Sequence, residues 1–181
     1  MLWESFRNGD KEAFATLFRG HYDALYRYGS KFTGNAAALE DAIQELFIEL
    51  WQAKSRTPVV SVRAYLLKAL KYKLLKDFRQ KGRLISLSDN PDISFEWSHE
   101  HFLIAQQETA EKRESVLNAL ASLTNRQKEI IYLRFYQNLS YEEVSEIMNI
   151  NYQVARNLLY QAIKSLKALL AGAMIFFILL L

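Results

Sequence analysis

The last helical segment of the sequence carries a row of side chains suited to contacting DNA. Six polar or tyrosine side chains there have a spacing that places them on one outer side of a helix: Tyr152, Gln153, Arg156, Asn157, Tyr160 and Gln161. Arginine pairs bidentately with guanine, and asparagine or glutamine pairs with adenine. The chemistry that this row favours is hydrogen bonding to base edges and phosphates.

The residues around this row predict a helix-turn-helix. Ser140 and Glu143 have the spacing of a capping box, and Leu139 and Val144 have that of a hydrophobic staple. The helix that starts there is predicted to end at Met148, and Asn151 can cap the final helix after a joint at 149–151. The predicted shared core is Val144, Ile147, Ile150, Val154, Leu158, Leu159 and Ile163. A helical hairpin with a polar surface remains the alternative, and a joint without glycine is less typical of the motif.

A second group of candidate residues lies in a cationic segment further upstream. Residues 54–83 hold 10 basic side chains and one acid, whereas residues 1–53 hold 5 basic and 8 acidic ones. Residues 84–122 hold 2 basic and 7 acidic side chains, and residues 123–168 hold 6 and 4. Such a cationic block is often a solvated helix face, but it also fits a phosphate-binding surface. Tyr65, Tyr72 and Phe78 lie among the cations and are suited either to stacking unpaired bases or, above all for Phe78, to core packing.

The periodicity of the apolar residues predicts helices almost throughout. Three helices with short connections are predicted at 11–32, 36–52 and 62–81, the first with Asp10 as its N-cap, and such a set can bury a common core. Helical pattern resumes near Ile104, and Thr124 with Gln127 gives a further capping box. The predicted fold is all-α: two small helical domains, 1–83 and 105–168, joined by a flexible acidic linker at 84–104, with the helix-turn-helix in the second domain and a hydrophobic tail at 169–181.

Several classes of site are disfavoured. The chain of 181 residues has no cysteine, which excludes disulfides and thiol-ligated metals and suits a reducing cytoplasm, and its first residues do not form a secretory signal. His99, Glu100 and His101 are a weak metal-binding pattern in the predicted linker, so no metal is expected. The sequence has no glycine-rich phosphate loop and no nucleophile with a paired base, so no cofactor or small-molecule substrate is expected.

The chain finishes in fourteen uncharged residues, ALLAGAMIFFILLL. As a helix they would cover only about 21 Å of a bilayer core of roughly 30 Å. A tail that is buried or capped by a partner is therefore favoured over a membrane anchor.

Four blocks in order resemble the bacterial RNA polymerase sigma factors of the extracytoplasmic-function (ECF) type. They are GDKEAFATLFRGHYDALYRYG, LEDAIQELFIELW, VRAYLLKALKYKLLKDFRQKGR and the segment from LTNRQKEI to AIKSLK, and they span about residues 9–168. The resemblance implies a cytoplasmic, non-enzymatic factor that binds core RNA polymerase, directs it to promoter DNA and helps to open the duplex. An anti-sigma factor is a further candidate partner. The alternative is a helix-turn-helix transcription regulator that acts without polymerase and associates with a membrane through its tail.

The resemblance also implies roles for individual residues. The polymerase-binding positions are Asp41, Gln44, Glu45, Phe47, Leu50 and Trp51, of which Phe47 and Trp51 are better explained by packing. The minus-ten DNA positions are Arg63, Tyr65, Lys68, Lys71, Tyr72, Lys73 and Arg79. The minus-thirty-five DNA positions are Gln153, Arg156, Asn157, Tyr160 and Lys164. The family commonly has Asn where this chain has Tyr72 and Asp where it has Lys76, so the identity of a flipped base is not predicted.

Overall fold

The computed structural model describes residues 2–53, 59, 61–80, 82, 93–97 and 110–179, except for the side chains of 110–113 and 171–179. Within these ranges all regular secondary structure is helical, which confirms the predicted all-α class. The chain forms two compact units, one made mainly of Met1–Pro91 and the other of Asp92–Val144 with Ile150–Leu181.

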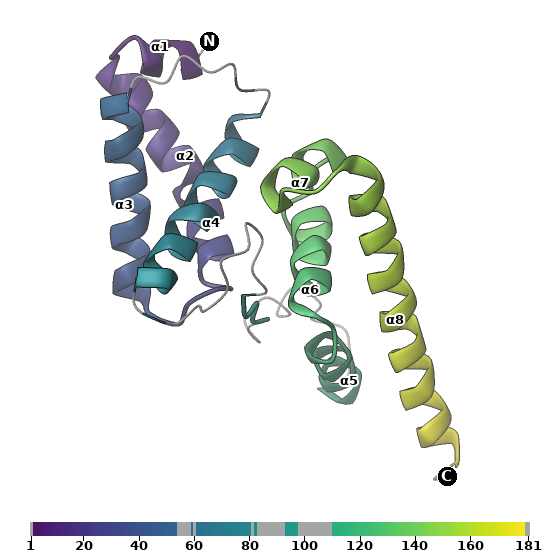
Figure 1. Ribbon diagram of the computed structural model, residues 1–181. Helices are drawn as coiled ribbons and strands as arrows, with labels where there is room; N and C mark the ends of the chain where they lie inside the picture. The colour runs from purple at the N-terminus through teal and green to yellow at the C-terminus, as the bar shows by residue number, and fades with distance from the viewer. Residues whose placement is uncertain are drawn as a thin grey trace. The chain divides into compact units, whose positions relative to one another are not determined.

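The described part of the first unit is a bundle of three long helices and one short helix. Helices α2 (Lys11–Gly29), α3 (Ala36–Ala53) and α4 (Val62–Gln80) pack against one another in pairs, and α1 (Leu2–Arg7) packs on α2 (Figure 1). The three long helices confirm the prediction, whereas α1 was not predicted. Its Phe6 is buried, with ring centroids 6.1 Å from Phe14 and 5.8 Å from Trp51. A helix of six residues with one buried ring gives no periodic signal in the sequence.

The ends of these helices follow from local hydrogen bonds. The predicted cap at Asp10 is confirmed, because its carboxylate accepts from the backbone N–H groups of Glu12 and Ala13 at 2.9 and 3.3 Å. Helix α2 ends at Gly29, three residues earlier than predicted. Asn35 caps α3, because its Oδ1 atom accepts from Ala38 N at 3.1 Å. The segment between α2 and α3 therefore both interrupts the helical chain and supplies the start signal of α3.

The described residues from 93 onward form four helices and a π-helical turn. Helices α5 (Ala110–Ala121) and α6 (Asn125–Ile131) both pack on α8 (Tyr152–Leu179), and α7 (Tyr141–Met148) precedes α8 (Figure 1). The capping box of Thr124 and Gln127 at the start of α6 is confirmed, with both of its hydrogen bonds present. The π-helical turn η2 (Tyr132–Tyr136) directly follows α6 and was not predicted. A single π turn has no distinct sequence period, so periodicity cannot reveal it.

Side-chain hydrogen bonds fix the start of each of the two helices in the helix-turn-helix. Ser140 N donates to Glu143 Oε2 at 2.8 Å and Glu143 N donates to Ser140 Oγ at 3.2 Å, which confirms the second capping box. Asn151 Oδ1 accepts from Val154 N at 2.8 Å and so caps α8, as predicted. Asn149 has φ 51°, a left-handed conformation that asparagine tolerates better than most residues. This asparagine supplies the turn for which many such joints use glycine.

The predicted core of this motif is correct only in part. Val144, Ile147 and Leu159 are buried, but Ile150, Leu158 and Ile163 are only half-buried. The prediction for Val154 is wrong, because its side chain is 43% exposed. The buried stripe of α8 is instead Ala155, Leu159 and Ala162, whose spacing of four and three residues lets α8 approach its neighbours closely. Apolarity alone had favoured Val154 over the smaller alanines.

Part of the predicted flexible linker is anchored on the second unit. Phe95 is 1% exposed, its N–H donates to Asn125 Oδ1 at 3.1 Å, and its ring centroid lies 5.7 Å from that of Tyr132. Trp97 lies 5.0 Å from Tyr136, measured between ring centroids. Residues 93–97 therefore belong to the second unit, which corrects the prediction for this stretch. The rest of the predicted linker, with His99, Glu100 and His101, lies outside the described residues.

The hydrophobic tail continues α8 as far as Leu179. None of the helices in the described residues is both long enough and apolar enough to span a bilayer.

Candidate nucleic-acid interface

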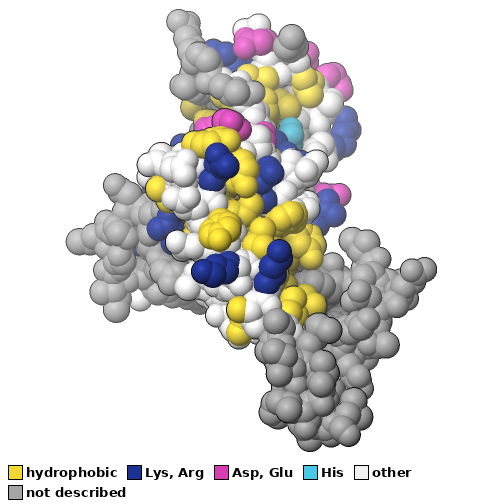
Figure 2. Space-filling model, turned by 90° about the vertical axis from the view of Figure 1, so that its right-hand side faces the viewer, with side chains coloured by type: hydrophobic (Ala, Val, Ile, Leu, Met, Phe, Trp, Pro, Cys, Tyr) yellow, Lys and Arg dark blue, Asp and Glu magenta, His cyan; other side chains and the backbone are white. Residues whose placement is uncertain are grey.

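The exposed face of α8 presents the whole predicted minus-thirty-five set. The exposed side chains of that set are Gln153, Arg156, Asn157, Tyr160 and Lys164. Gln161 on the same helix is exposed as well. Tyr160 is 69% exposed, and Gln153 Nε2 donates to Asn157 Oδ1 at 3.2 Å. Figure 2 looks at the side of the molecule where α8 lies in Figure 1, and it shows Lys and Arg side chains interspersed with hydrophobic ones. This face can donate to phosphates and base edges without any rearrangement of the backbone.

A row of cations and aromatic rings supports this face. The Arg134 guanidinium lies 4.4 Å from the centre of the Tyr141 ring, and Arg134 also donates to the carbonyl of Leu139. The Tyr141 and Tyr152 rings meet edge to face at 5.6 Å, and the Arg156 guanidinium lies 6.0 Å from the Tyr152 ring centre. Sequence reasoning missed Arg134 and Tyr141, because they lie before and at the start of α7 and share no helical face with Arg156.

The exposed side of α4 collects part of the predicted minus-ten set. A rotation of 100° per residue places Lys68, Tyr72, Lys76 and Arg79 on one side of the helix. Tyr72, Lys76 and Arg79 are exposed, with Tyr72 at 40%, and Lys68 is half-buried. Tyr72 is thus an accessible aromatic ring among cations, the combination that suits unpaired bases.

The other predicted minus-ten residues are less accessible. Arg63 is half-buried beside His21, and burial together with the Arg63 charge lowers the pKa of that histidine. Tyr65 is also half-buried, with its ring edge to face against Trp3 of α1 at 5.8 Å. Lys71 is only 5% exposed, so a phosphate cannot reach it in this arrangement. We therefore correct the expectation for Lys71 and leave it out of the phosphate-binding set.

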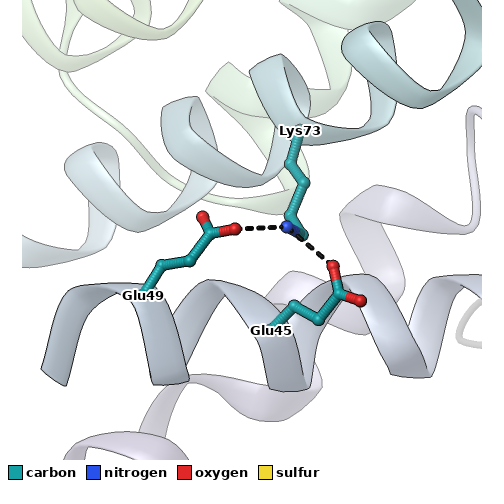
Figure 3. Close-up of polar contacts among 3 residues, drawn as sticks. All are labelled: Glu45, Glu49 and Lys73. Atoms are coloured by element: carbon teal, nitrogen blue, oxygen red, sulfur yellow. Dashed lines mark hydrogen bonds and ion pairs between the residues drawn. The ribbon is translucent and has the colours of Figure 1, made fainter. Parts of the chain in front are cut away.

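Lys73 lies at the boundary between α4 and α3 and binds two carboxylates. Its Nζ atom is 2.8 Å from Glu45 Oε2 and 2.9 Å from Glu49 Oε1 (Figure 3). Burial alone would lower the pKa of Lys73, but the hydrogen bonds and charges of the two glutamates outweigh it and the pKa is raised. The hydrogen bond from Lys73 and the charge of Lys73 lower the pKa of Glu45. The raised pKa of Lys73 and the lowered pKa of Glu45 keep both of these groups ionised at neutral pH.

The predicted polymerase-binding set divides by burial. Asp41, Gln44 and Glu45 are exposed on α3, whereas Phe47 and Leu50 are buried in the bundle. Trp51 is half-buried and packs on Phe6 and Phe14 of the same unit.

Two exposed residues extend the polar side of α3 and were missed by sequence reasoning. They are Glu49 and Ile48, and the Ile48 side chain is 50% exposed. Ile48 is four residues from Gln44 and Glu49 is four residues from Glu45, and this helical spacing was the available signal that they share a side of α3. No group of three metal-ligating side chains occurs among the described residues.

Comparison with known proteins agrees with this architecture. Residues 17–84 match the family "Sigma-70 region 2" and residues 113–166 match "Sigma-70, region 4". The chain is 29% identical to "RNA polymerase sigma factor SigV" of Bacillus subtilis over 162 residues, which cover 87% of this chain and 90% of SigV. It is 25% identical to "ECF RNA polymerase sigma factor SigL" of Mycobacterium tuberculosis over 166 residues, or 88% and 92% of the two chains.

Two solved structures share the fold. One is the sigma factor RpoE in complex with the anti-sigma factor NepR from Bartonella quintana, with TM-score 0.60, 22% identity and coverage of 87% of this chain and 96% of that chain. The other is CnrH in complex with the cytosolic domain of CnrY, with TM-score 0.63, 20% identity and coverage of 94% and 96%. The two family regions, which follow the order of the two structural units, together with these curated relatives show that this chain belongs to the sigma-70 family of RNA polymerase sigma factors, in its extracytoplasmic-function group.

Proposed function

We propose that three surfaces divide the work of this sigma factor, which binds core RNA polymerase and directs it to specific promoters. The face of α8 with Arg156 reads the minus-thirty-five element, the face of α4 with Tyr72 holds the opened minus-ten strand, and the polar side of α3 with Asp41 binds the polymerase. The corresponding domains are 1–83 and 105–168, with residues 93–97 added to the second.

The exposed row on α8 is the observation that carries this proposal. Arg156, Asn157 and Tyr160 project from a helix whose start is fixed by Asn151 and whose opposite stripe is buried. A correct bidentate base contact discriminates against a wrong base by about 1–3 kcal/mol. Gln153 and Lys164 flank these three residues and supply contacts to the DNA backbone.

The proposed role of α4 depends on an energy balance. Unstacking a base costs a few kcal/mol, and stacking it on an aromatic ring returns roughly 1–3 kcal/mol. Tyr72 is the accessible ring on this face, and Lys68, Lys76 and Arg79 lie on the same side to hold the phosphates. Strand opening by this route needs no nucleotide hydrolysis and no cofactor in the sigma factor.

The proposed polymerase contact is electrostatic at its edges and apolar at its centre. Asp41, Gln44, Glu45 and Glu49 surround the exposed Ile48 on one side of α3. Charge complementarity calls for a basic helical surface with an apolar centre on the polymerase.

The same chain is a candidate for regulation by a partner. RpoE and CnrH were each solved with a protein bound to them, an anti-sigma factor in the case of RpoE. An anti-sigma factor that covers α3 or the face of α8 would block the proposed contacts directly. The proposed function places the protein in the cytoplasm, where polymerase and chromosome meet.

In vitro transcription tests this assignment. Purified protein and core polymerase are given a genomic library, and new start sites are mapped. Arg156→Ala is expected to lower promoter-specific transcripts about 5- to 150-fold, the equivalent of 1–3 kcal/mol, while binding to core polymerase is unchanged. Arg19→Ala, which removes an exposed arginine from α2, is the matched control. Loss of transcription together with polymerase binding in the Arg156 variant would show that the roles are wrongly assigned.

A further inference from the structure

The ion-pair triad between α3 and α4 joins two surfaces that are proposed to bind different partners. Glu45 and Glu49 belong to the polar side of α3, and Lys73 belongs to the cationic helix α4 (Figure 3). The three groups are held at 2.8 and 2.9 Å. An event at one surface therefore has a direct electrostatic route to the other.

Lys73 is close to the DNA-facing side of α4 but does not take part in it. At 100° per residue, Lys73 is turned by about 100° from its neighbour Tyr72 and by about 60° from Lys76. Its long flexible side chain can cover either direction, and the two glutamates fix it in the direction of α3. While the triad is formed, Lys73 cannot pair with a phosphate beside Tyr72.

The two carboxylates of the triad are more exposed than its lysine, so a binding partner contacts the carboxylates first. The side chains of Glu45 and Glu49 are 63% and 65% exposed, whereas that of Lys73 is 12% exposed. A cationic surface that approaches α3 meets the carboxylates first. Ion pairs with exposed carboxylates are weak and screened by salt, so a competing cation can replace Lys73.

We propose that Glu45 and Glu49 form a latch that withholds Lys73 from DNA in the free protein and releases it when a basic surface of core polymerase takes the two carboxylates. Lys73 then swings toward Tyr72 and neutralises a phosphate of the opened strand. The inference depends on the proposed DNA role of α4 and goes beyond it by coupling DNA binding to polymerase binding. Such coupling is reciprocal, so a phosphate that holds Lys73 also strengthens polymerase binding at the freed carboxylates.

The test measures binding of the full-length protein, without polymerase, to a fluorescent single-stranded oligonucleotide across a series of KCl concentrations. Glu45→Gln with Glu49→Gln keeps the shape of the side chains and removes their charge. This variant should bind more tightly at low salt, and its plot of log affinity against log salt should steepen by about 0.7, the value for one more phosphate on a single strand. The matched control is Glu12→Gln with Glu40→Gln, which removes two charges from exposed acids outside the triad.

A second variant identifies the released cation. Lys73→Gln added to the double glutamate variant should return the salt slope to that of the wild type. Lys73→Gln alone should leave the steepness of the free protein's plot of log affinity against log salt unchanged. In the complex with core polymerase the same substitution should make that plot less steep by about 0.7. Since this variant is read out in both states, the test does not depend on the glutamate variant being folded.

The results separate the latch from the proposed role of α4. An equal slope in the Glu45/Glu49 and Glu12/Glu40 variants, or an unchanged slope for Lys73→Gln in the polymerase complex, would overturn the latch. If Tyr72→Ala nevertheless impairs promoter opening, the DNA role of α4 stands without it. If Tyr72→Ala has no effect on opening, the proposed role of α4 itself fails.

Discussion

The anchor of residues 93–97 on the second unit gives a sharp prediction for Phe95→Ala. The Phe95 ring is 1% exposed and lies edge to face against Tyr132 at 5.7 Å and against Trp97 at 6.4 Å. Truncation of a buried phenylalanine to alanine costs about 3–5 kcal/mol. We expect about 3 kcal/mol, the lower end of that range, because the segment 93–97 lies at the start of the second unit and can detach, which avoids leaving a rigid cavity.

Hydrogen exchange followed by mass spectrometry measures this loss unit by unit. A loss of about 3 kcal/mol corresponds to roughly 150-fold faster exchange of the protected amides in α6 and η2. Amides of α2, α3 and α4 should exchange at the wild-type rate, since Phe95 belongs to the second unit.

Phe135→Ala is the matched control for this prediction. Phe135 belongs to η2, next to the aromatic rings that Phe95 contacts, but it is 62% exposed. Its truncation should change stability by no more than about 0.5 kcal/mol, or roughly twofold in exchange rate. Equal rates in the two variants would refute the anchor, because they would mean that the buried ring and the exposed ring contribute alike.

Two further predictions concern the first unit. Gly29→Ala should lower the free energy of unfolding, measured by thermal unfolding, by about 1–3 kcal/mol. The added Cβ would lie 2.3 Å from Leu39 Cδ1 and 3.3 Å from Leu70 Cδ2 in the core. The control Gly20→Ala, whose Cβ would have no atom within 4 Å, should instead raise the free energy of unfolding by about 0.5–1 kcal/mol. Nuclear magnetic resonance titration of Glu45 should give a midpoint below the ordinary 4.5, returning to it in Lys73→Gln. Since the folded-state pKa is depressed, the stabilisation from this pair is present above pH 4.5 and is lost as the pH falls through the lower value; a normal Glu45 midpoint in the wild type would contradict the pair.

The helices that sequence analysis located correctly are those whose start signals are local. The cap at Asp10, the two capping boxes and the cap at Asn151 each depend on residues two to three apart, and the structure confirms all of them. Helix α1 and the anchor at Phe95 depend on contacts distant in the chain, 30 residues away in the case of Asn125. Composition and periodicity do not encode such contacts, so the anchor appeared only as an irregular stretch.

The candidate site was predicted best where side chains point away from the core. The α8 row is exposed as expected, because helical spacing decides which residues share a face. The α4 set was predicted less well, since Lys71 is buried and Lys73 is paired with α3. Whether a cation faces solvent or a neighbouring helix depends on packing between helices, and the charge count of residues 54–83 does not contain that information.

The anchored segment also changes how the two DNA-binding surfaces are coupled. With 84–104 as a free linker, about 20 residues would extend to roughly 70 Å. Because residues 93–97 belong to the second unit, only residues 81–92 separate the end of α4 from the anchor, and twelve residues extend to about 40–43 Å. A shorter tether raises the effective concentration of one surface once the other is bound, up to the point where it can no longer span the two elements. We therefore propose that the aromatic contacts of Phe95 and Trp97 contribute to promoter choice through the separation of the two elements, although neither residue is proposed to touch DNA.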